Sequence, residues 1–354
     1  MVLLVSIAVL FPHVLAAANV KNHFLQAQRL GVEESPLKVG ATVMVTGIGS
    51  LGWHDALAVL AQGVKKAAKK SRNHWELNAL VPEKFTPQDE EFLIDVGFDR
   101  ILRRPIPVEP KEVTNAFAKE NLERVMGHSG LNQFLLAEET LKYWGLALTE
   151  YDRSLVIDAD VIITDPMDEL MTRPESLIGV YDHGLDFDGS TVPPVQGGFL
   201  LFRPNLTDFE EVKRLTREGD WAGDGWKHSN IGWCYGGVGP DGLLSYYFNK
   251  DSLTEFRNLN ARESSFVEAA PTHGEDMTTR HRSLPEGLGT PKVSEKVRML
   301  AADRLKYDVV MNARLRHDLD VALSQGATKE SLLQAVTSVH YTGDCIKPWT
   351  CSEA

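Results

Sequence analysis

Short apolar runs alternate with longer stretches of helical periodicity in the part of the chain that follows residue 40. The runs at 41–47 and 75–82 predict strands, and the stretch between them, to about Lys70, predicts a helix. Residues 87–97 predict a second helix, with Pro at its start and Gly at its end, and 100–106 predict a third strand. Strands that alternate with helices indicate an α/β fold with a mostly parallel sheet and helices on both faces.

The next segments bring two carboxylates to the end of a buried strand. Between residues 132 and 148 the apolar side chains recur at helical spacing, which predicts a helix packed on the sheet. The run Leu155–Ile157 is stiff, apolar and strand-forming, and it carries Asp158 and Asp160 at its end. Because side chains alternate along a strand, both carboxylates are expected on one side, with Ala159 turned away.

A carboxylate pair of this kind is typical of a site for a hard divalent cation. Mg²⁺ and Mn²⁺ take oxygen ligands and leave some positions to water and to substrate phosphates. The pair therefore suggests a site that a diphosphate completes. Ordinary polar residues at a strand end are the competing interpretation of the tripeptide taken alone.

The composition limits the possible partners. With 354 residues, 43% hydrophobic and 24% charged, the chain can bury a large core. The formal net charge of −12 argues against a nucleic-acid partner, because phosphate contacts need clustered Lys and Arg. The three cysteines lack the spacing of a zinc site. The chain is therefore expected to be globular, with no nucleic acid and no structural zinc.

Both ends of the chain differ from the domain predicted at 41–350. Residues 1–40 include the apolar run Val2–Phe11 and predict a leader, either a signal peptide or a membrane anchor. A leader implies the secretory pathway and the Golgi lumen, whereas a misassigned gene start implies a cytoplasmic protein. Residues 272–291 are rich in Gly, Pro, Thr and charge and predict an exposed loop or lid. Residues 351–354 form a short tail.

The segment GIGSLG, Gly47–Gly52, favours a different function. It fits the G-x-G-x-x-G pattern between a strand and a helix, which makes an NAD(P)-dependent oxidoreductase an alternative. Such an enzyme also needs an acid at the end of the second strand, about 20 residues onward. The nearest acids are Glu76, at the start of that strand, and Glu83, beyond Pro82. The fingerprint is therefore incomplete, and a flexible strand-to-helix turn is the competing interpretation of the glycines.

Four stretches carry a more specific pattern when they are taken together. They are YDRSLVIDADVIITDPMDEL, VQGGFLLFRPN, PDGLLSYYFN and VHYTGDCIKPW. In order and spacing they resemble glycosyltransferase family 8, the family of glycogenin, over roughly Ala41 to Trp349. The resemblance implies a GT-A type fold and a retaining, metal-dependent transfer of a hexosyl group from a UDP-sugar.

The resemblance also implies the ligands of the metal and of the diphosphate. Asp158 and Asp160 match the family's D-x-D metal ligands, and His340 matches the third ligand of Mn²⁺ or Mg²⁺. Lys347 matches a lysine that holds the diphosphate, and Gly343 leaves room for the backbone to approach it. The cation and Lys347 would then neutralise the charge that develops on the leaving nucleoside diphosphate.

Further donor contacts are implied in four other segments. Thr46 and Trp53 fall near positions that contact uracil, and Trp53 offers a stacking face. Lys142 falls on a helix lysine that contacts the donor sugar, and Lys142 and Asp241 are the implied catalytic residues. The remaining implied donor-binding residues are Ala159, Gln196, Gly197 and Gly198.

The sequence departs from the family in three places. Gln196 replaces an Asn, which concerns sugar specificity, and Pro240 and Asp241 replace an Asp-Gln pair, which leaves one carboxylate. Asp241 is expected to face the anomeric carbon or the sugar hydroxyls. Asp308 replaces an Asn in the segment 304–315, which is interpreted as a core strand near the edge of the sheet. These changes leave open a degenerate member that binds a nucleotide sugar or a glycan without turnover.

The acceptor stays open at this stage. A glycan, a polyol, a lipid and a protein all fit the family, because variable loops build the acceptor sites. The implied partners are therefore a UDP-sugar donor and one of these acceptors, with possible membrane anchorage through the N-terminus.

Overall fold

The computed structural model describes residues 35–48, 51–126, 134–182, 185, 187, 192–263, 298–303, 305–310, 315–324 and 326–341. The chain divides into two units, one of Leu37–Glu255 with Val297–Ala354 and the other of Met1–Pro36 with Phe256–Lys296. The first unit is described below. The predicted leader up to residue 34, the predicted lid and the tail lie outside the described residues. In the ranges given, no helix has both the length and the apolar character that crossing a membrane requires.

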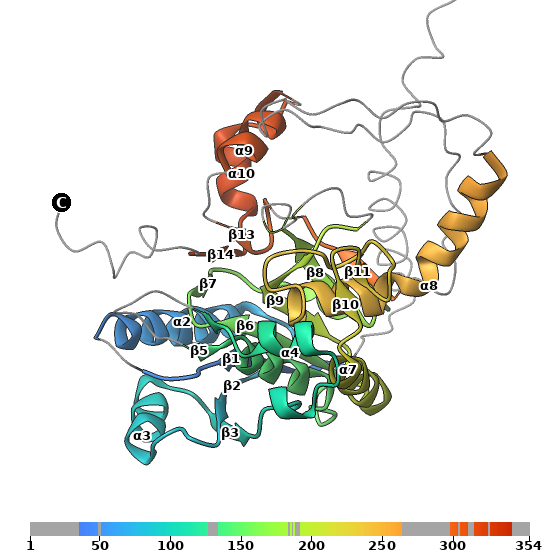
Figure 1. Ribbon diagram of the computed structural model, residues 1–354. Coiled ribbons are helices and arrows are strands. Elements are labelled where there is room, and N and C mark those ends of the chain that lie inside the picture. The colour runs from blue at the N-terminus through green and yellow to red at the C-terminus, as the bar shows by residue number, and fades with distance from the viewer. Residues whose placement is uncertain are drawn as a thin grey trace, which may run out of the picture. The chain divides into compact units, whose positions relative to one another are not determined.

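A seven-stranded sheet forms the centre of the first unit, in the order β12-β8-β9-β6-β1-β2-β3. Figure 1 labels all of these strands except β12. Its strands are β1 (Lys38–Met44), β2 (His74–Pro82), β3 (Arg100–Arg104), β6 (Arg153–Asp158), β8 (Leu177–Tyr181), β9 (Val195–Phe202) and β12 (Met299–Ala301). Strand β9 runs antiparallel to β6 and β8, and the other neighbouring pairs are parallel. The predicted α/β class with a mixed, mostly parallel sheet is confirmed.

Helices cover both faces of this sheet. Among the described residues, the α-helices are α2 (Leu51–Lys70), α3 (Pro87–Val96), α4 (Ala116–Leu122), α5 (Leu136–Glu139), α6 (Asp168–Met171), α7 (Leu206–Glu218), α8 (Pro240–Glu263), α9 (Leu315–Ser324) and α10 (Lys329–Ala335). Leu155 and Ile157 of β6 pack into one core with α2 and α3, whereas Val156 packs into a second core with α4, α7 and α8. Because side chains alternate across a strand, these three consecutive residues contribute to the cores on both faces of the sheet.

Local signals set the ends of α3 where the sequence predicts them. The side chain of Thr86 caps the helix by accepting a hydrogen bond from the N–H of Asp89 at 3.2 Å, and Pro87 starts the first turn. Gly97 ends the helix with φ 112°, a left-handed conformation that favours glycine. The predicted helix at 87–97 is therefore confirmed.

The single helix predicted at 132–148 is wrong. The chain instead forms β5 (Phe134–Leu135), α5 and the 3₁₀-helix η2 (Thr140–Leu146). Side chains three residues apart eclipse one another in a 3₁₀-helix, so Lys142 and Gly145 share one face. Gly145 lies so close to β6 that a Cβ there would come within 2.5 Å of Val156 Cγ2. The apolar spacing correctly indicated burial on the sheet but not the type of helix.

A second, three-stranded sheet has the order β13-β14-β7. It contains β7 (Val161–Ile163), β13 (Val309–Val310) and β14 (Ser338–His340). The described part of the core strand predicted at 304–315 is β13, which belongs to this sheet and not to the edge of the main one. Asp308, directly before β13, adopts φ 54°, a left-handed conformation that is uncommon for a residue other than glycine.

The remaining short elements connect these layers. They are the 3₁₀-helix η1 (Pro110–Glu112), the hairpin of β4 (Val125–Met126) with β5, and the hairpin of β10 (Trp221–Ala222) with β11 (Gly225–Trp226).

Candidate active site

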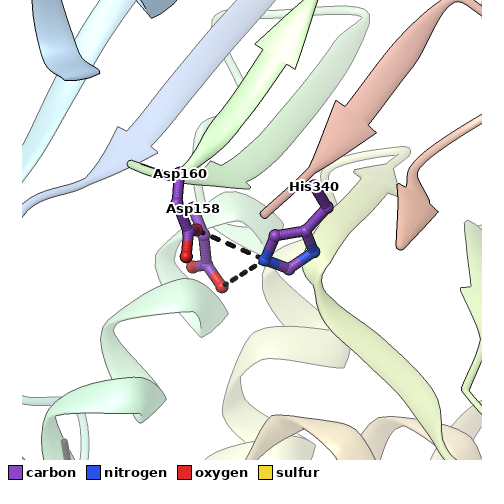
Figure 2. A group of neighbouring side chains, drawn as sticks. All are labelled: Asp158, Asp160 and His340. Atoms are coloured by element: carbon purple, nitrogen blue, oxygen red, sulfur yellow. Dashed lines mark ion pairs between the residues drawn. The ribbon is translucent and has the colours of Figure 1, made fainter. Parts of the chain in front are cut away.

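Asp158 and Asp160 lie where β6 passes into β7. Asp158 is the last residue of β6, and Ala159 and Asp160 form a turn before β7 begins at Val161. The sequence pattern predicted that alternation within one strand would point both carboxylates the same way. In the structure the turn at Ala159 and Asp160 brings them together instead. Ligand atoms of Asp158, Asp160 and His340 lie within 4.8 Å of one another (Figure 2).

The pairing of β14 with β7 brings His340 to the two aspartates. His340 is the register partner of Val161, and the N–H of Tyr341 donates to the carbonyl of Asp160 at 3.1 Å. The imidazole Nε2 lies 3.3 Å from Asp160 Oδ1 and 4.0 Å from Asp158 Oδ2. Two antiparallel strands thus fix three ligand atoms around one point.

The residues around this point fit a divalent cation. The register of β6 with β9 pairs Ile157 with Phe199, so Gly198 lies beside Asp158. A Cβ at Gly198 would come within 2.2 Å of His340 Cε1 and 3.0 Å of Asp158 Oδ2. The glycine therefore keeps open the space between the ligands. Two carboxylates and an imidazole are donors suited to a cation such as Mn²⁺ or Mg²⁺.

A third carboxylate lies behind the imidazole. Asp308 is fully buried, its Oδ1 lies 3.4 Å from His340 Nδ1, and its own N–H donates to Ser338 Oγ at 2.8 Å. Burial lowers the pKa of His340, but Asp308 and Asp160 outweigh burial and raise it well above its ordinary value. A carboxylate on Nδ1 orients a ligating histidine and directs its other nitrogen to the metal. Asp308 was expected only as part of a core strand, and this role was not predicted from the sequence. An acid in the apolar run YDVV was the available signal.

Lys142 lies on the other side of Asp158. Its side chain is 2% exposed, its Nζ is 2.8 Å from Asp158 Oδ1, and it also forms an ion pair with Glu139. Burial lowers the pKa of Lys142, but the opposite effects of Asp158, Glu139 and Asp241 are larger and raise it. The ammonium therefore stays charged. Glu139 was not predicted from the sequence, although its spacing of three residues from Lys142 is typical of an intrahelical ion pair.

A cavity of about 250 Å³ opens beside this lysine. Its lining residues are Met126, Leu136, Glu139, Lys142, Asp158, Asp182, Leu185, Gln196, Tyr235, Gly236 and Asp241. Burial raises the pKa of Asp241 to about 8, although Lys142 acts in the opposite direction. A Cβ at Gly197 would come within 2.5 Å of Asp241 Oδ1 and 3.2 Å of Lys142 Nζ. Gly197 and Gly198 thus leave room on the two sides of β9, one beside the cavity and one beside the cation ligands.

The amide of Gln196 is held in place at the cavity wall. Its Nε2 donates to Asp182 Oδ2 at 3.2 Å, and its Oε1 accepts from the N–H of Gly198 at 3.0 Å. Asp182 was not predicted from the sequence. Together these residues present fixed polar atoms to whatever enters the cavity.

Other residues expected at the site lie apart from the cavity or outside the described residues. Thr46 follows β1, whose Met44 is the register partner of Asp158, so it lies at the same edge of the sheet. Trp53 is in the first turn of α2, and neither residue lines the cavity. Gly343 and Lys347 lie outside the described residues.

The described ends of the glycine-rich segment follow β1 and begin α2, which is the order that a dinucleotide-binding turn requires. Glu76, however, lies in the first half of β2, accepts a hydrogen bond from Tyr151 and lies 3.4 Å from Arg100 Nη1. Glu76 is thus paired near the N-terminal end of β2, whereas an acid that binds the ribose has to lie at the C-terminal end. The structure gives the oxidoreductase alternative no support.

No model of a known protein family matches the chain, and no curated protein matches it. Several solved glycosyltransferase structures are similar at low identity. Mouse xyloside xylosyltransferase 1 in its apo form has a TM-score of 0.47 and 10% identity, over 88% of this chain and 100% of that one. The galactosyltransferase LgtC in complex with donor and acceptor sugar analogs has a TM-score of 0.40 and 11% identity, over 88% of each chain. The glycosyltransferase GlyE of Streptococcus pneumoniae has a TM-score of 0.40 and 12% identity, over 91% of this chain and 57% of that one.

Proposed function

We propose that this protein is a metal-dependent, retaining glycosyltransferase that moves a hexosyl group from a UDP-sugar to an acceptor. One observation carries the proposal. The ligand set of Asp158, Asp160 and His340 shares Asp158 with the buried ammonium of Lys142, and that ammonium opens on a cavity with fixed polar walls. A cation site beside a sugar-sized cavity is what a nucleotide-sugar donor needs.

Asp158, Asp160 and His340 would hold a cation, and through it the diphosphate end of the donor. A bound Mn²⁺ or Mg²⁺ supplies charge neutralisation for the leaving nucleoside diphosphate. Asp308 holds the imidazole of His340 in the orientation in which Nε2 faces the two aspartates. Lys347 and Gly343 enter the proposal through the family 8 resemblance only, as further contacts to the diphosphate.

The cavity would hold the sugar. The Lys142 ammonium stands at its inner wall, where it stabilises negative charge near the bond that breaks. Asp241 shares that wall and is proposed to bind a sugar hydroxyl or to face the anomeric carbon. Gln196 and Asp182, which are hydrogen-bonded to each other at the cavity wall, are proposed to contact the ring hydroxyls. We assign no nucleophile.

The test is release of UDP from a panel of UDP-sugars with Mn²⁺, without an added acceptor. We expect slow hydrolysis of at least one donor, and its loss with EDTA and in Asp160→Ala. Asp165→Ala is the matched control, because Asp165 is an exposed aspartate five residues further on that pairs with Lys70 at 2.6 Å. Binding of UDP with Mn²⁺ but no turnover of any donor would instead indicate a degenerate nucleotide-sugar-binding protein. Failure to bind UDP would refute both.

A further inference from the structure

A group of aromatic side chains lies close to the cavity and has no role in the donor site. Phe117 of α4 stacks on Trp221 of β10, with ring centroids 5.4 Å apart, and Trp221 packs on Trp233 at 4.8 Å. Phe187 meets the Trp233 ring edge-on at 5.6 Å. We call Phe117, Trp221, Trp233 and Phe187 the aromatic platform.

The platform has a fixed base and open upper rings. Trp221 is buried, and its Nε1 donates to the carbonyl of Gly232 at 2.8 Å. Phe117 and Phe187 are each 46% exposed, and Trp233 is half-buried between them. Several large rings exposed together on one anchored base are uncommon on a protein surface without a ligand or a partner.

The platform is continuous with the cavity. The N–H of Tyr235 donates to the carbonyl of Leu185 at 2.9 Å, and the N–H of Phe187 donates to the carbonyl of Trp233 at 3.3 Å. Tyr235 and Leu185 line the cavity, and Tyr235 is itself 44% exposed. The same pair of hydrogen-bonded segments therefore carries cavity-lining residues at one end and platform rings at the other.

The geometry points to a carbohydrate acceptor whose pyranose rings lie on the aromatic platform while its terminal hydroxyl enters the cavity. This inference rests on the proposed function and names the acceptor class for the same site. The C–H face of a pyranose packs on the electron-rich face of an aromatic ring, and its hydroxyls remain free at the rim. Asp224, next to Gly223 at the edge of Trp233, pairs with His228 at 2.7 Å, so polar groups lie beside the rings.

Charge and shape disfavour the other acceptors. The cavity is lined by four acidic side chains and by one ammonium, that of Lys142. The raised pKa of Asp241 keeps that group protonated at neutral pH, and the other acidic groups, Glu139, Asp158 and Asp182, still outnumber the ammonium. An acceptor with a phosphate or carboxylate near its reactive hydroxyl would be repelled there. An acyl chain needs a continuous groove of apolar side chains, whereas the platform presents flat rings bordered by charged groups. A neutral glycan fits both features.

The experiment measures binding of linear oligosaccharides of glucose, galactose, mannose, xylose and N-acetylglucosamine to the full chain with UDP and Mn²⁺, by isothermal titration. We expect at least one to bind, and Phe117→Ala, Phe187→Ala and Trp233→Leu each to weaken that binding about three- to tenfold, because each removes one stacking face. Ile94→Ala is the matched control, since Ile94 is an exposed apolar residue of α3, 49% exposed, and it should bind as the wild type does.

The outcomes separate the two proposals. Hydrolysis of a UDP-sugar without binding of any oligosaccharide, or with equal binding by the platform variants, would overturn the glycan site and leave the reaction standing. Oligosaccharide binding that depends on the rings, without hydrolysis of any donor, would support the glycan site and refute the reaction. Binding of myo-inositol or of a tyrosine peptide in place of oligosaccharides would assign the acceptor to another class.

Discussion

Gly198→Ala adds one methyl group to the space between the cation ligands. The new Cβ would lie 2.2 Å from His340 Cε1, whereas an ordinary contact begins near 3.4 Å, so the imidazole must move by about 1.2 Å (3.4 − 2.2). Metal–ligand distances tolerate displacements of only about 0.2 Å. We therefore expect Gly198→Ala to lower Mn²⁺ affinity by about 100-fold or more, since that displacement removes one ligand from the site.

Gly197→Ala is the matched control, with the same methyl group one residue away on the same strand. Its Cβ would instead meet Asp241 Oδ1 at 2.5 Å and Lys142 Nζ at 3.2 Å, on the cavity side. Mn²⁺ affinity, measured by electron paramagnetic resonance with circular dichroism as the folding check, should then stay within about threefold of wild type, while UDP-sugar hydrolysis falls. Equal Mn²⁺ affinities for folded Gly198→Ala and the wild type would refute the assignment of the cation site.

Three further substitutions test the surroundings of the site. Burial raises the pKa of Asp241 to about 8, so its contribution to stability is present below the unfolded pKa of about 4 and is lost as pH rises to 8. Across this pH range the Asp241→Asn variant should therefore become more stable relative to the wild type, as measured by urea unfolding with EDTA. Parallel curves of stability against pH for the two proteins would contradict this. Lys142→Met leaves the Asp158 carboxylate without its buried cation and should cost about 3 kcal/mol in the same assay, whereas a loss under 1 kcal/mol would argue against a buried ion pair. Gly145→Ala places a methyl 2.5 Å from the Val156 side chain and should cost about 1–3 kcal/mol by overpacking, which an unchanged urea midpoint would exclude.

Local chemistry made part of the fold predictable. The cap at Thr86, the proline after it and the left-handed Gly97 act within a few residues, so the sequence alone located α3. The apolar run before Asp158 likewise predicted β6. The α-helix predicted over Thr140 to Leu146 was wrong because the same apolar spacing fits an α-helix and a 3₁₀-helix. The close contact of Gly145 with β6, which separates the two, is a tertiary one.

The candidate site depends more on long-range pairing. Asp158 and Asp160 were predicted from neighbouring residues, but His340 joins them only because β14 pairs with β7, and nothing local to His340 indicates that pairing. Family resemblance supplied it. Asp308 and Asp182 were missed for the same reason. Asp308 acts through His340 and Asp182 through Gln196, and neither partner is a neighbour in the sequence.

The most direct test of the central claim is titration of Mn²⁺ into the protein with and without UDP, followed by electron paramagnetic resonance, for the wild type and Asp160→Asn. A donor diphosphate that completes the site must raise Mn²⁺ affinity, and Mn²⁺ must raise UDP affinity by the same factor. We predict one Mn²⁺ per chain, tighter binding with UDP, and loss of both in Asp160→Asn. UDP binding that is equally strong with EDTA, or equal Mn²⁺ affinity in the wild type and Asp160→Asn, would contradict the account.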